Sequence, residues 1–233
     1  MVHIGIIPDG NRRWCKINNH DQIYLLEIWL KKINKIIKCI SNNNKYIFLK
    51  NINEISIYIC SIDNLKRDDK TKYIIFKFIE KLNQIYNNYN SYFKKDIIKN
   101  LENSYIHINF IGDLELLPEN IQEIINNFKK KNNLRNVNIE KNKIFTINLA
   151  VAYNYHNDLL NYSNNNLENY NRNQSNIDLI FRSGKENRIS GFFPTKILYS
   201  EIYFSKKYWP DITLNDLNLA IKNFLGRERR FGK

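Results

Sequence analysis

Apolar, β-branched runs alternate along the chain with longer segments in which apolar residues recur at helical spacing. Six such runs lie at residues 4–7, 55–60, 106–111, 145–151, 177–181 and 202–204. Strands that alternate with helices are typical of folds in which crossover helices cover both faces of a largely parallel sheet. The pattern therefore predicts an α/β fold with a mostly parallel central β-sheet of about six strands, flanked by helices.

Four segments have the apolar periodicity of amphipathic helices. Residues 21–39 and 71–92 are the longest, and we expect them to form walls of an apolar tunnel between the sheet and the helices. Pro118 opens the third helix at a position that favours proline, and Thr213 caps the fourth, with Asp216 in its first turn. The apolar positions of the two long helices are Leu25, Leu26, Trp29, Ile33, Ile36, Ile37, Ile74, Ile75, Phe78, Ile79, Leu82 and Ile85.

Length and composition fit a single domain that spans residues 1–233. The chain has 233 residues and no proline- or glycine-rich linker, and 43% of its residues are hydrophobic, which is enough to build a core. Asn-rich stretches interrupt the pattern at residues 42–44 and 161–166, where polar side chains bury little surface. We therefore expect residues 161–176 to form a loop insertion.

The chain is strongly basic, with a formal net charge of +13. Such a charge favours an anionic partner: a nucleic acid, an acidic membrane surface or a phosphorylated small molecule. The lysines are scattered as on ordinary solvated faces, and no nucleic-acid recognition motif accompanies them. The sequence therefore predicts no nucleic-acid partner, while charge alone does not choose between the other two.

Cysteine usage and hydropathy predict an intracellular setting. Cys15, Cys39 and Cys60 are odd in number and widely spaced, which indicates neither a disulfide framework nor a zinc cluster. No signal peptide precedes the first strand, and charges interrupt every apolar run before it reaches the length of a membrane span. We expect a cytoplasmic protein with at most peripheral contact to a membrane.

A first candidate site follows the first predicted strand, where residues 9–14 read Asp-Gly-Asn-Arg-Arg-Trp. Glycine lets the backbone approach a ligand closely, and arginine binds phosphate oxygens as a rigid fork. Ligands of open parallel sheets bind outside the carboxyl ends of the strands, which is where this motif lies. The motif predicts a phosphate and metal site, and the alternative is an ordinary Asp-Gly turn followed by a solvated basic pair.

A second candidate site follows the predicted strand at 177–181. Residues 182–190 read Arg-Ser-Gly-Lys-Glu-Asn-Arg-Ile-Ser, and Glu201 comes a short distance further on. Two arginines, a serine hydroxyl and backbone amides beside a glycine form a suitable diphosphate cradle. The alternative is a basic surface loop. We expect this segment, with Glu201, to lie at the same sheet edge as residues 9–14.

Together these motifs resemble the cis-prenyltransferase family, also called Z-isoprenyl diphosphate synthases or undecaprenyl diphosphate synthase-like proteins. The resemblance covers nearly the whole chain. It also rests on Ser-Ile-Asp-Asn-Leu-Lys-Arg at 61–67, Ile-Gly-Asp at 111–113, Leu-Pro at 117–118, Trp-Pro-Asp at 209–211 and Arg-Glu-Arg-Arg-Phe-Gly at 227–232. It implies a Mg²⁺-dependent transferase that condenses isopentenyl diphosphate with an allylic diphosphate primer, such as farnesyl diphosphate. The product is a longer Z-polyprenyl diphosphate, and no redox cofactor is needed.

The resemblance also implies roles for individual residues. Asp9 binds Mg²⁺ and assists departure of the allylic diphosphate, Glu201 is a further metal ligand, and Asn64 acts by positioning in proton removal. The tail at 226–233 reaches the active site of the partner in a homodimer. The residues implied for the allylic substrate are Gly10, Asn11, Arg12, Arg13, Trp14, His20, Ser61, Ile62, Asp63, Leu65 and Arg67. Those implied for isopentenyl diphosphate are Arg182, Arg188, Ile189, Ser190, Arg230 and Gly232.

Several positions depart from the family pattern. Arg12 replaces a commoner small residue, Asp63 replaces glutamate and Leu65 replaces tryptophan, while the charge pattern is kept. The segment before His20 is shorter than in the family and lacks its arginine, so His20 is matched to the family histidine by position. His156 stands where the family has Gly-Gly-Arg after a tyrosine, and a surface role is favoured over that of a replacement ligand.

Two other functions are weighed against an active enzyme. A catalytically weak scaffold subunit of a heteromeric prenyltransferase would be expected to lose the metal carboxylates, whereas Asp9 and Glu201 are both present. A basic nucleic-acid-binding protein is less favoured still, because no recognition motif supports it. The sequence therefore favours an active cis-prenyltransferase.

Overall fold

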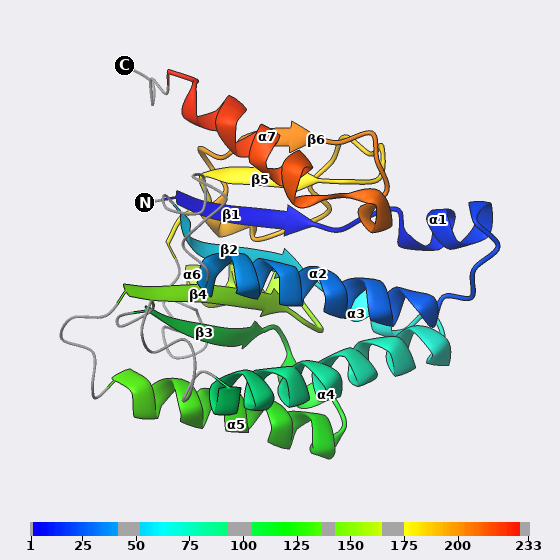
Figure 1. Ribbon diagram of the computed structural model, residues 1–233, viewed down its shortest axis with the longest axis vertical. Helices are drawn as coiled ribbons and strands as arrows, with labels where there is room; N and C mark the ends of the chain where they lie inside the picture. The colour runs from blue at the N-terminus through cyan, green and yellow to red at the C-terminus, as the bar shows by residue number, and fades with distance from the viewer. Residues whose placement is uncertain (1, 42–51, 93–103, 137–142, 165–174, 229–233) are drawn as a thin grey trace.

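Six strands form one parallel sheet in the computed structural model, which describes residues 2–41, 52–92, 104–136, 143–164 and 175–228 (Figure 1). The strands are β1 (Val2–Ile7), β2 (Ile52–Tyr58), β3 (Ser104–Ile111), β4 (Lys143–Ala150), β5 (Leu179–Arg182) and β6 (Glu201–Phe204). Their order is β3-β4-β2-β1-β5-β6, and every neighbouring pair is parallel. The predicted fold class and all six predicted strands are confirmed, with small shifts of their ends.

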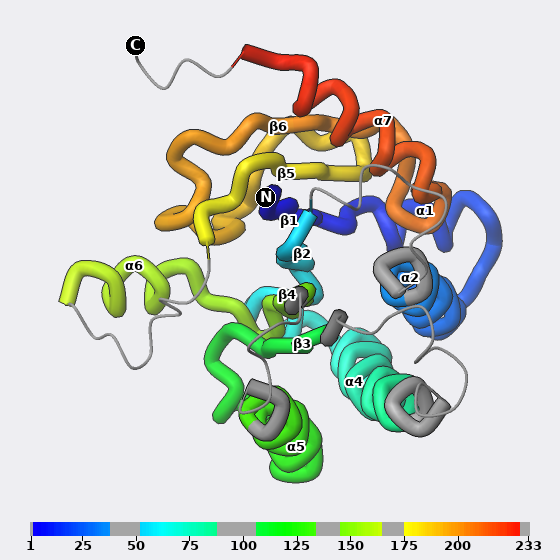
Figure 2. The backbone as a smooth tube through the Cα atoms, turned by 60° about the vertical axis from the view of Figure 1, so that its left-hand side comes forward, coloured from blue at the N-terminus to red at the C-terminus, as the bar shows by residue number. Residues whose placement is uncertain are grey.

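Helices lie on both sides of this sheet. They are α1 (Asn11–Ile17), α2 (Tyr24–Ser41), α3 (Ile62–Leu65), α4 (Asp69–Tyr92), α5 (Glu119–Asn136), α6 (Tyr155–Ser163) and α7 (Leu214–Leu225), with short 3₁₀ turns η2 (Leu114–Leu116), η3 (Pro194–Lys196) and η4 (Trp209–Asp211). Figure 2 shows α2, α4 and α7 on one side of the sheet and α6 on the other. The four predicted helices are confirmed. Pro118 lies just before α5, and its carbonyl accepts the N–H groups of Ile121 and Gln122 in the first turn of that helix.

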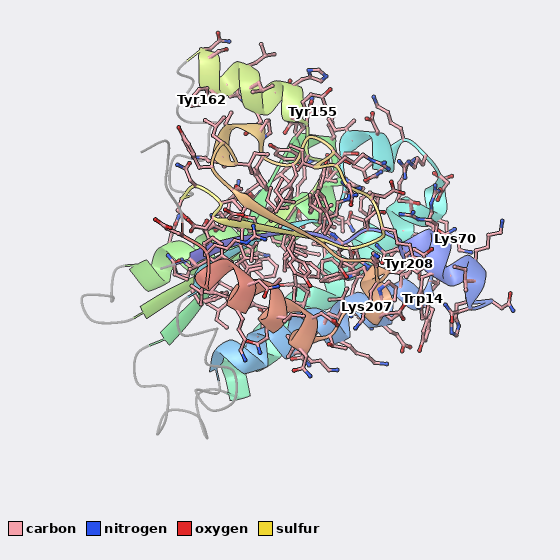
Figure 3. All side chains as sticks on the ribbon, turned by 90° about the horizontal axis from the view of Figure 1, so that it is seen from above. Trp14, Lys70, Tyr155, Tyr162, Lys207 and Tyr208 are labelled. Carbon is pink, nitrogen blue, oxygen red and sulfur yellow. The ribbon has the colours of Figure 1, made fainter. Side chains whose placement is uncertain are left out.

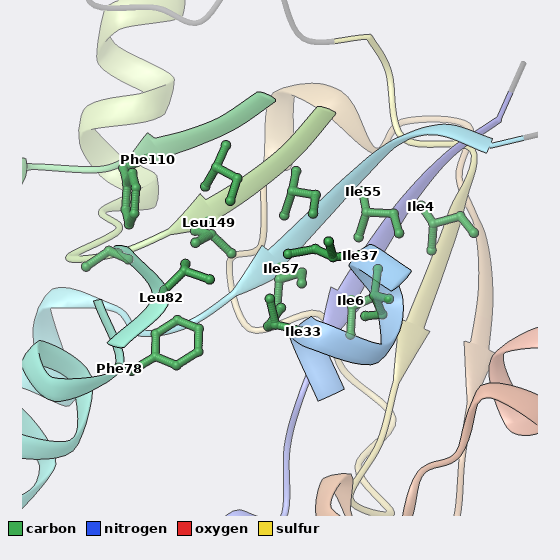
Figure 4. Close-up of a cluster of buried hydrophobic side chains, with 14 of the residues drawn as sticks. Ile4, Ile6, Ile33, Ile37, Ile55, Ile57, Phe78, Leu82, Phe110 and Leu149 are labelled. Carbon is green, nitrogen blue, oxygen red and sulfur yellow. The ribbon is translucent and has the colours of Figure 1, made fainter. Parts of the chain in front are cut away.

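The main core lies between the sheet and the helices α2, α4 and α7. Ile6 and Ile57 from the strands pack against Ile33 of α2, and Leu82 of α4 packs beside them (Figure 4). These side chains are each at most 3% exposed. The apolar faces predicted for α2 and α4 from their helical periodicity are therefore the faces that are buried against the sheet.

Polar side chains are buried on the opposite face of the sheet. His3 Nε2 lies 2.8 Å from Ser56 Oγ, and His3 Nδ1 lies 3.0 Å from the carbonyl oxygen of Ser175. Asn148 Nδ2 donates to Glu54 Oε1 at 2.7 Å. Because buried polar groups are costly unless they are hydrogen-bonded, this network fixes the pairing of β1, β2 and β4. The apolar pattern alone did not predict it.

Three helices were missed by the periodicity: α1, α3 and α6. The loop predicted at 161–176 begins too early, because α6 continues to Ser163, while residues 165–174 lie outside the described part of the chain. The side chain of Asn154 caps α6 by accepting the N–H of His156, and no α6 residue is buried, so the helix has no strong apolar period. Within the described residues, no helix combines the length and the apolar character needed to cross a membrane.

Candidate active site

A large cleft opens at the carboxyl ends of β1, β2 and β5, beside α1, α2 and α4. Its volume is about 990 Å³. Polar and basic side chains form part of its lining, and apolar side chains of α2 and α4 form another part. The cleft contains most of the predicted site residues: Asp9, Gly10, Asn11, Arg12, Arg13, Ser61, Ile62, Asp63, Asn64, Arg67, Arg182, Arg188 and Ser190. A lining that combines basic and apolar side chains suits an amphipathic ligand with an anionic head.

The turn at Asp9 is held from several directions. The N–H of Asp9 donates to Ser183 Oγ at 2.9 Å, and the carbonyl of Asp9 accepts the N–H of Trp209 at 3.0 Å. Gly10 has φ of +90°, and a Cβ built on it would lie 2.3 Å from a ring carbon of Tyr208. The chain therefore needs glycine at this position in order to leave β1 and enter α1 under the Tyr208 ring.

Five charged residues that line the cleft form an alternating series, which we call the charge ring. Arg182 Nη2 donates to Asp9 Oδ2 at 2.7 Å, and Arg13 Nη2 lies 3.4 Å from Asp9 Oδ1. Glu186 links Arg13 to Arg188, since its Oε1 accepts from Arg13 at 2.7 Å and its Oε2 accepts from Arg188 at 2.6 Å. The ring carries three positive charges and two negative charges, so an anion that displaces either carboxylate finds paired guanidiniums.

Arg182 is the buried member of the charge ring, with a side chain only 3% exposed. Its Nη1 donates to Ser190 Oγ at 2.9 Å and also to the carbonyl of Arg188. Its Nε is buried and has no hydrogen-bond partner among the described residues. The prediction that the 182–190 segment lies beside residues 9–14 is therefore confirmed for Arg182, Arg188 and Ser190.

Asp9 stays ionised at neutral pH. Burial works to raise its pKa, but the hydrogen bonds from Arg182 and from the Gly10 N–H, with the charges of Arg182 and Arg13, outweigh burial and hold the pKa below its ordinary value. Cys60 on the cleft wall behaves in the opposite way, because burial raises the pKa of its thiol to about 12. Asp9 is thus an anion ready to bind a cation, whereas Cys60 is an inert part of the wall.

The donor set fits Mg²⁺ only together with a phosphate ligand. Among the described residues no group of three or more His, Cys, Asp or Glu side chains is arranged to hold a metal. Mg²⁺ is commonly held by one or two carboxylates together with substrate phosphates and waters. Asp9, with Glu186 across Arg13, provides that kind of incomplete protein site.

The 61–67 segment borders the cleft through α3. Ser61 and Asn64 cap this helix reciprocally: the Asn64 N–H donates to Ser61 Oγ at 3.2 Å, and the Ser61 N–H donates to Asn64 Oδ1 at 3.1 Å. This capping box fixes the Asn64 side chain at the cleft wall. Leu65 does not line the cleft and instead packs against the core.

Two predicted aromatic residues lie outside the cleft. The rings of Trp14 and His20 stack with centroids 5.2 Å apart, and His20 stacks on Tyr24 at 4.4 Å. Trp14 Nε1 also donates to Asp211 Oδ1 at 2.7 Å. Figure 3 shows Trp14 and Tyr208 at the same end of the molecule. The contacts of His20 therefore support a stacking role within the short α1–α2 connection.

The prediction that Glu201 lies at the same sheet edge as residues 9–14 is wrong within one chain. Glu201 begins β6 and pairs with Leu179 at the start of β5, whereas Arg182 ends β5. Glu201 and Arg182 are therefore separated by three residues along the strand direction, which is about 10 Å. Glu201 instead forms an ion pair with Arg227. The predicted strand at 202–204 already implies this position, because in a parallel sheet the residue just before that strand lies at its amino end, away from Arg182.

The remaining predicted residues lie in different places. Ile189 packs in a second apolar cluster, and His156 is exposed at the cleft rim with its ring 4.0 Å from that of Tyr155. Arg230 and Gly232 lie outside the described residues. Sequence reasoning gave no role to Glu186, although it lies inside the 182–190 motif, and it missed Tyr208, whose ring faces the Arg13 guanidinium at 5.5 Å.

Comparisons with known proteins agree in covering nearly the whole chain. The profile of the undecaprenyl diphosphate synthase family matches residues 7–232. An isoprenyl transferase of Rickettsia typhi is 28% identical over 249 residues, covering 100% of this chain and 98% of the relative. The (2E,6E)-farnesyl-diphosphate-specific ditrans,polycis-undecaprenyl-diphosphate synthase of Wigglesworthia glossinidia brevipalpis is 30% identical over 244 residues, covering 99% of this chain and 87% of the relative.

The fold is also similar to that of a solved prenyl diphosphate synthase. The crystal structure of lavandulyl diphosphate synthase from Lavandula x intermedia, in complex with dimethylallyl diphosphate, superposes with a TM-score of 0.73 at 24% identity. The match covers 99% of this chain and 98% of that one.

Proposed function

The chain belongs to the undecaprenyl diphosphate synthase family and is a prenyltransferase, and from this premise we propose how its cleft works. The cleft condenses isopentenyl diphosphate with an allylic diphosphate primer to give a longer Z-prenyl diphosphate. The charge ring carries this proposal. It supplies guanidiniums for two diphosphates, Arg13 beside Asp9 for the primer and Arg188, near Ser190, for isopentenyl diphosphate.

The reaction breaks the bond between primer C1 and its diphosphate oxygen, and the diphosphate leaves with the electron pair. A new bond joins primer C1 to the terminal alkene carbon of isopentenyl diphosphate, and one proton leaves to form the new double bond. Arg13 and Arg182 stabilise the negative charge that grows on the leaving diphosphate, and both stay protonated at working pH. Asp9 holds Arg182 and Arg13 in place before the substrates bind.

Magnesium fits the proposal as a cofactor shared with the substrate. Asp9 would hold the ion together with diphosphate oxygens, and when bound the ion supplies further stabilisation of the leaving group. In this proposal Glu201 acts as a metal ligand only where a second copy of the chain brings it near a cleft, because within one chain it pairs with Arg227.

Asn64 is the group we place nearest to proton removal. A side-chain amide is a poor base, so its role is to orient the substrate while a diphosphate oxygen takes the proton. The capping box that fixes Asn64 on α3 supports this positioning role.

The outer edge of the sheet supports the proposal of a homodimer. Strand β6 is an edge strand, and Ile202 and Phe204 on it are 39% and 37% exposed. Leu198 and Tyr199, just before β6, are 83% and 68% exposed. An exposed apolar edge strand is typical of a protein–protein contact. We propose that a second copy covers this edge and that the 226–233 tail reaches its cleft.

Turnover assays test the proposed function. Purified protein with Mg²⁺, isopentenyl diphosphate and each primer from dimethylallyl to geranylgeranyl diphosphate is expected to release diphosphate and form a longer prenyl diphosphate. Asp9→Ala should lower kcat by at least about 10²-fold, on the scale of a lost electrostatic group. Asp69→Ala removes an exposed carboxylate outside the cleft and should leave turnover unchanged. Failure of the unmodified protein to extend every one of these primers would overturn the proposal.

A further inference from the structure

Tyr208 lies on a segment that is bonded to both strand-end turns of the site. Just before it, the carbonyl of Lys207 accepts the Gly184 N–H at 2.8 Å. Just after it, the Trp209 N–H donates to the carbonyl of Asp9 at 3.0 Å. The two neighbours of Tyr208 therefore fix its backbone relative to both turns.

The ring of Tyr208 packs where these two turns meet. A Cβ built on Gly10 would lie 2.3 Å from Cδ1 of this ring and 3.2 Å from the Cα of Gly184. A Cβ built on Gly184 would lie 2.8 Å from the carbonyl carbon of Asp9. The two glycines have positive φ, +90° and +95°. The ring therefore covers Gly10 at a point where two glycine turns touch.

Two cations lie over the Tyr208 ring, one from each segment of the site. The guanidinium carbon of Arg13 is 5.5 Å from the ring centroid, and Lys185 Nζ is 5.0 Å from it. Both distances are within the range of about 6 Å at which the face of an aromatic ring attracts a cation. The ring thus joins Arg13 of the 9–14 segment with Lys185 of the 182–190 segment and adds no charge of its own.

The contact with Tyr208 leaves the N–H groups of Arg13 available to anions. A guanidinium carries its donors in its plane, so its edge binds carboxylate or phosphate oxygens while its face rests on an aromatic ring. The edge of Arg13 donates to Glu186 at 2.7 Å and lies 3.4 Å from an oxygen of Asp9. An incoming diphosphate competes with these carboxylates for the N–H groups. It does not compete with the ring, so the ring contact persists while the ion pairs exchange.

We propose that Tyr208 is a positioning residue for primer binding: its ring holds the Arg13 guanidinium in place when a diphosphate displaces the carboxylates of the charge ring. This inference rests on the proposed function, which assigns Arg13 to the primer. The Arg13 side chain is 42% exposed, so without the ring it has many solvated conformations to sample. A side chain that is held in advance loses less entropy when the ligand binds, and the ring therefore raises the affinity for the primer.

The two Michaelis constants test this role. Tyr208→Leu keeps an apolar side chain but removes the ring, and it should raise the KM for farnesyl diphosphate by about 3- to 10-fold, the scale of a lost cation–π contact. The KM for isopentenyl diphosphate should change by less than about twofold, because Arg13 is assigned to the other substrate. Tyr208→Phe keeps the ring and should restore the KM for farnesyl diphosphate to within about twofold of the unmodified protein. Equal values of this KM in the Leu and Phe variants would overturn the proposal.

Fluorinated phenylalanines at position 208 test the electrostatics of the ring at nearly constant shape. Fluorine withdraws electron density from the ring, so each added fluorine weakens the attraction between the ring face and a cation. The KM for farnesyl diphosphate should rise stepwise from phenylalanine through its mono-, di- and trifluoro analogues. This series does not depend on whether Tyr208→Leu folds well, and a KM that stays constant along it would contradict the role of the ring.

A double-mutant cycle identifies the cation through which the ring acts. In an Arg13→Ala background, Tyr208→Leu should no longer raise the KM for farnesyl diphosphate, whereas in a Lys185→Gln background it should still raise it. An undiminished effect in the Arg13→Ala background would overturn the assignment. Tyr73→Leu is the matched control. It also removes a tyrosine ring that lies under a cation, but that cation is Lys77 of α4, 5.9 Å from the centroid, so both KM values should stay unchanged.

Binding of farnesyl diphosphate alone separates this inference from the proposed function. Without isopentenyl diphosphate no condensation occurs, and tryptophan fluorescence reports the Kd. Tyr208→Leu should weaken binding by about 3- to 10-fold, and Tyr208→Phe should not. This pattern in a protein that shows no turnover would contradict the proposed function but not the role of Tyr208. Normal turnover with equal Kd values in the two variants would contradict the role of Tyr208 alone, and an unmodified protein that binds no farnesyl diphosphate would contradict both.

Discussion

At the scale of single residues, the structure shows why glycine stands between Asp9 and α1. Gly10 adopts a left-handed conformation, and the Tyr208 ring occupies the space that a side chain would need. That ring also faces the Arg13 guanidinium, so the position of one arginine of the charge ring depends on the Gly10 turn. The sequence alone identified the Asp-Gly pair. It did not identify Tyr208, because that contact joins segments almost two hundred residues apart.

Gly10→Ala should therefore damage both stability and activity. The added methyl group meets the Tyr208 ring, and the positive φ disfavours alanine, so we expect a loss of about 1–3 kcal/mol in the free energy of unfolding. Displacement of Arg13 should also raise the KM for the primer. Denaturant unfolding and steady-state kinetics measure the two effects. Gly226→Ala is the control, since Gly226 has no positive φ and its Cβ would make only ordinary contacts; equal losses in both variants would contradict this account.

At the scale of secondary-structure elements, predictions succeeded where a local signal determines the structure. The Thr213 side chain accepts the Asp216 N–H, and Asp216 Oδ2 accepts the Thr213 N–H at 2.8 Å, so the α7 cap is the one that the sequence predicts. Helix α6 was missed because no residue of it is buried. The position expected for Glu201 was wrong because this residue lies at the amino end of the parallel strand β6, whereas Arg182 lies at the carboxyl end of β5.

The cap of α7 gives a clean stability test. Thr213→Ala removes the side-chain acceptor and should lower the free energy of unfolding by about 1 kcal/mol. Thr213→Ser keeps the hydroxyl and should lose much less. Helix α7 buries Leu217, Ile221 and Phe224, so loss of its first turn should be visible in cooperative unfolding by circular dichroism. If Ser and Ala cost the same, the hydroxyl does not contribute.

The His3 network predicts a pH dependence for the pairing of β1 with β2. Burial lowers the pKa of His3 below its ordinary value of 6.5, although the nearby charge of Glu54 and the backbone bond to Ser175 act against burial. The unfolded chain therefore binds a proton more readily than the folded chain. Stability from this group is present above pH 6.5 and is lost as the pH falls through the lower, folded-state pKa. Thermal melting between pH 7.5 and 5 should show this fall, and His3→Gln should flatten it, whereas His20→Gln, at an exposed position, should not.

At the scale of the whole molecule, the cleft and the exposed edge strand lie on different parts of one sheet. The cleft uses the carboxyl ends of β1, β2 and β5, and β6 forms the edge beyond β5. The sequence placed residues 9–14 and 182–190 at one site because each segment follows a strand end, where parallel sheets bind ligands. It did not find the shared counterion Glu186. That pairing depends on how loops and helices from distant parts of the chain meet, and a single apolar stripe does not distinguish a pocket wall from core.

The edge of β6 leads to a prediction about assembly. Ile202→Asp places a charge on the exposed edge and should convert a homodimer to a monomer, because a desolvated charge without a partner opposes association. Sedimentation velocity should then report the 28.0 kDa chain mass in place of twice that value. Leu116→Asp is the matched control, since Leu116 is 58% exposed but follows β3 at the opposite edge of the sheet. If turnover falls in Ile202→Asp but not in Leu116→Asp, while the charge ring is intact, then residues beyond one chain complete the site. Dimers that survive Ile202→Asp unchanged would place the interface on another surface.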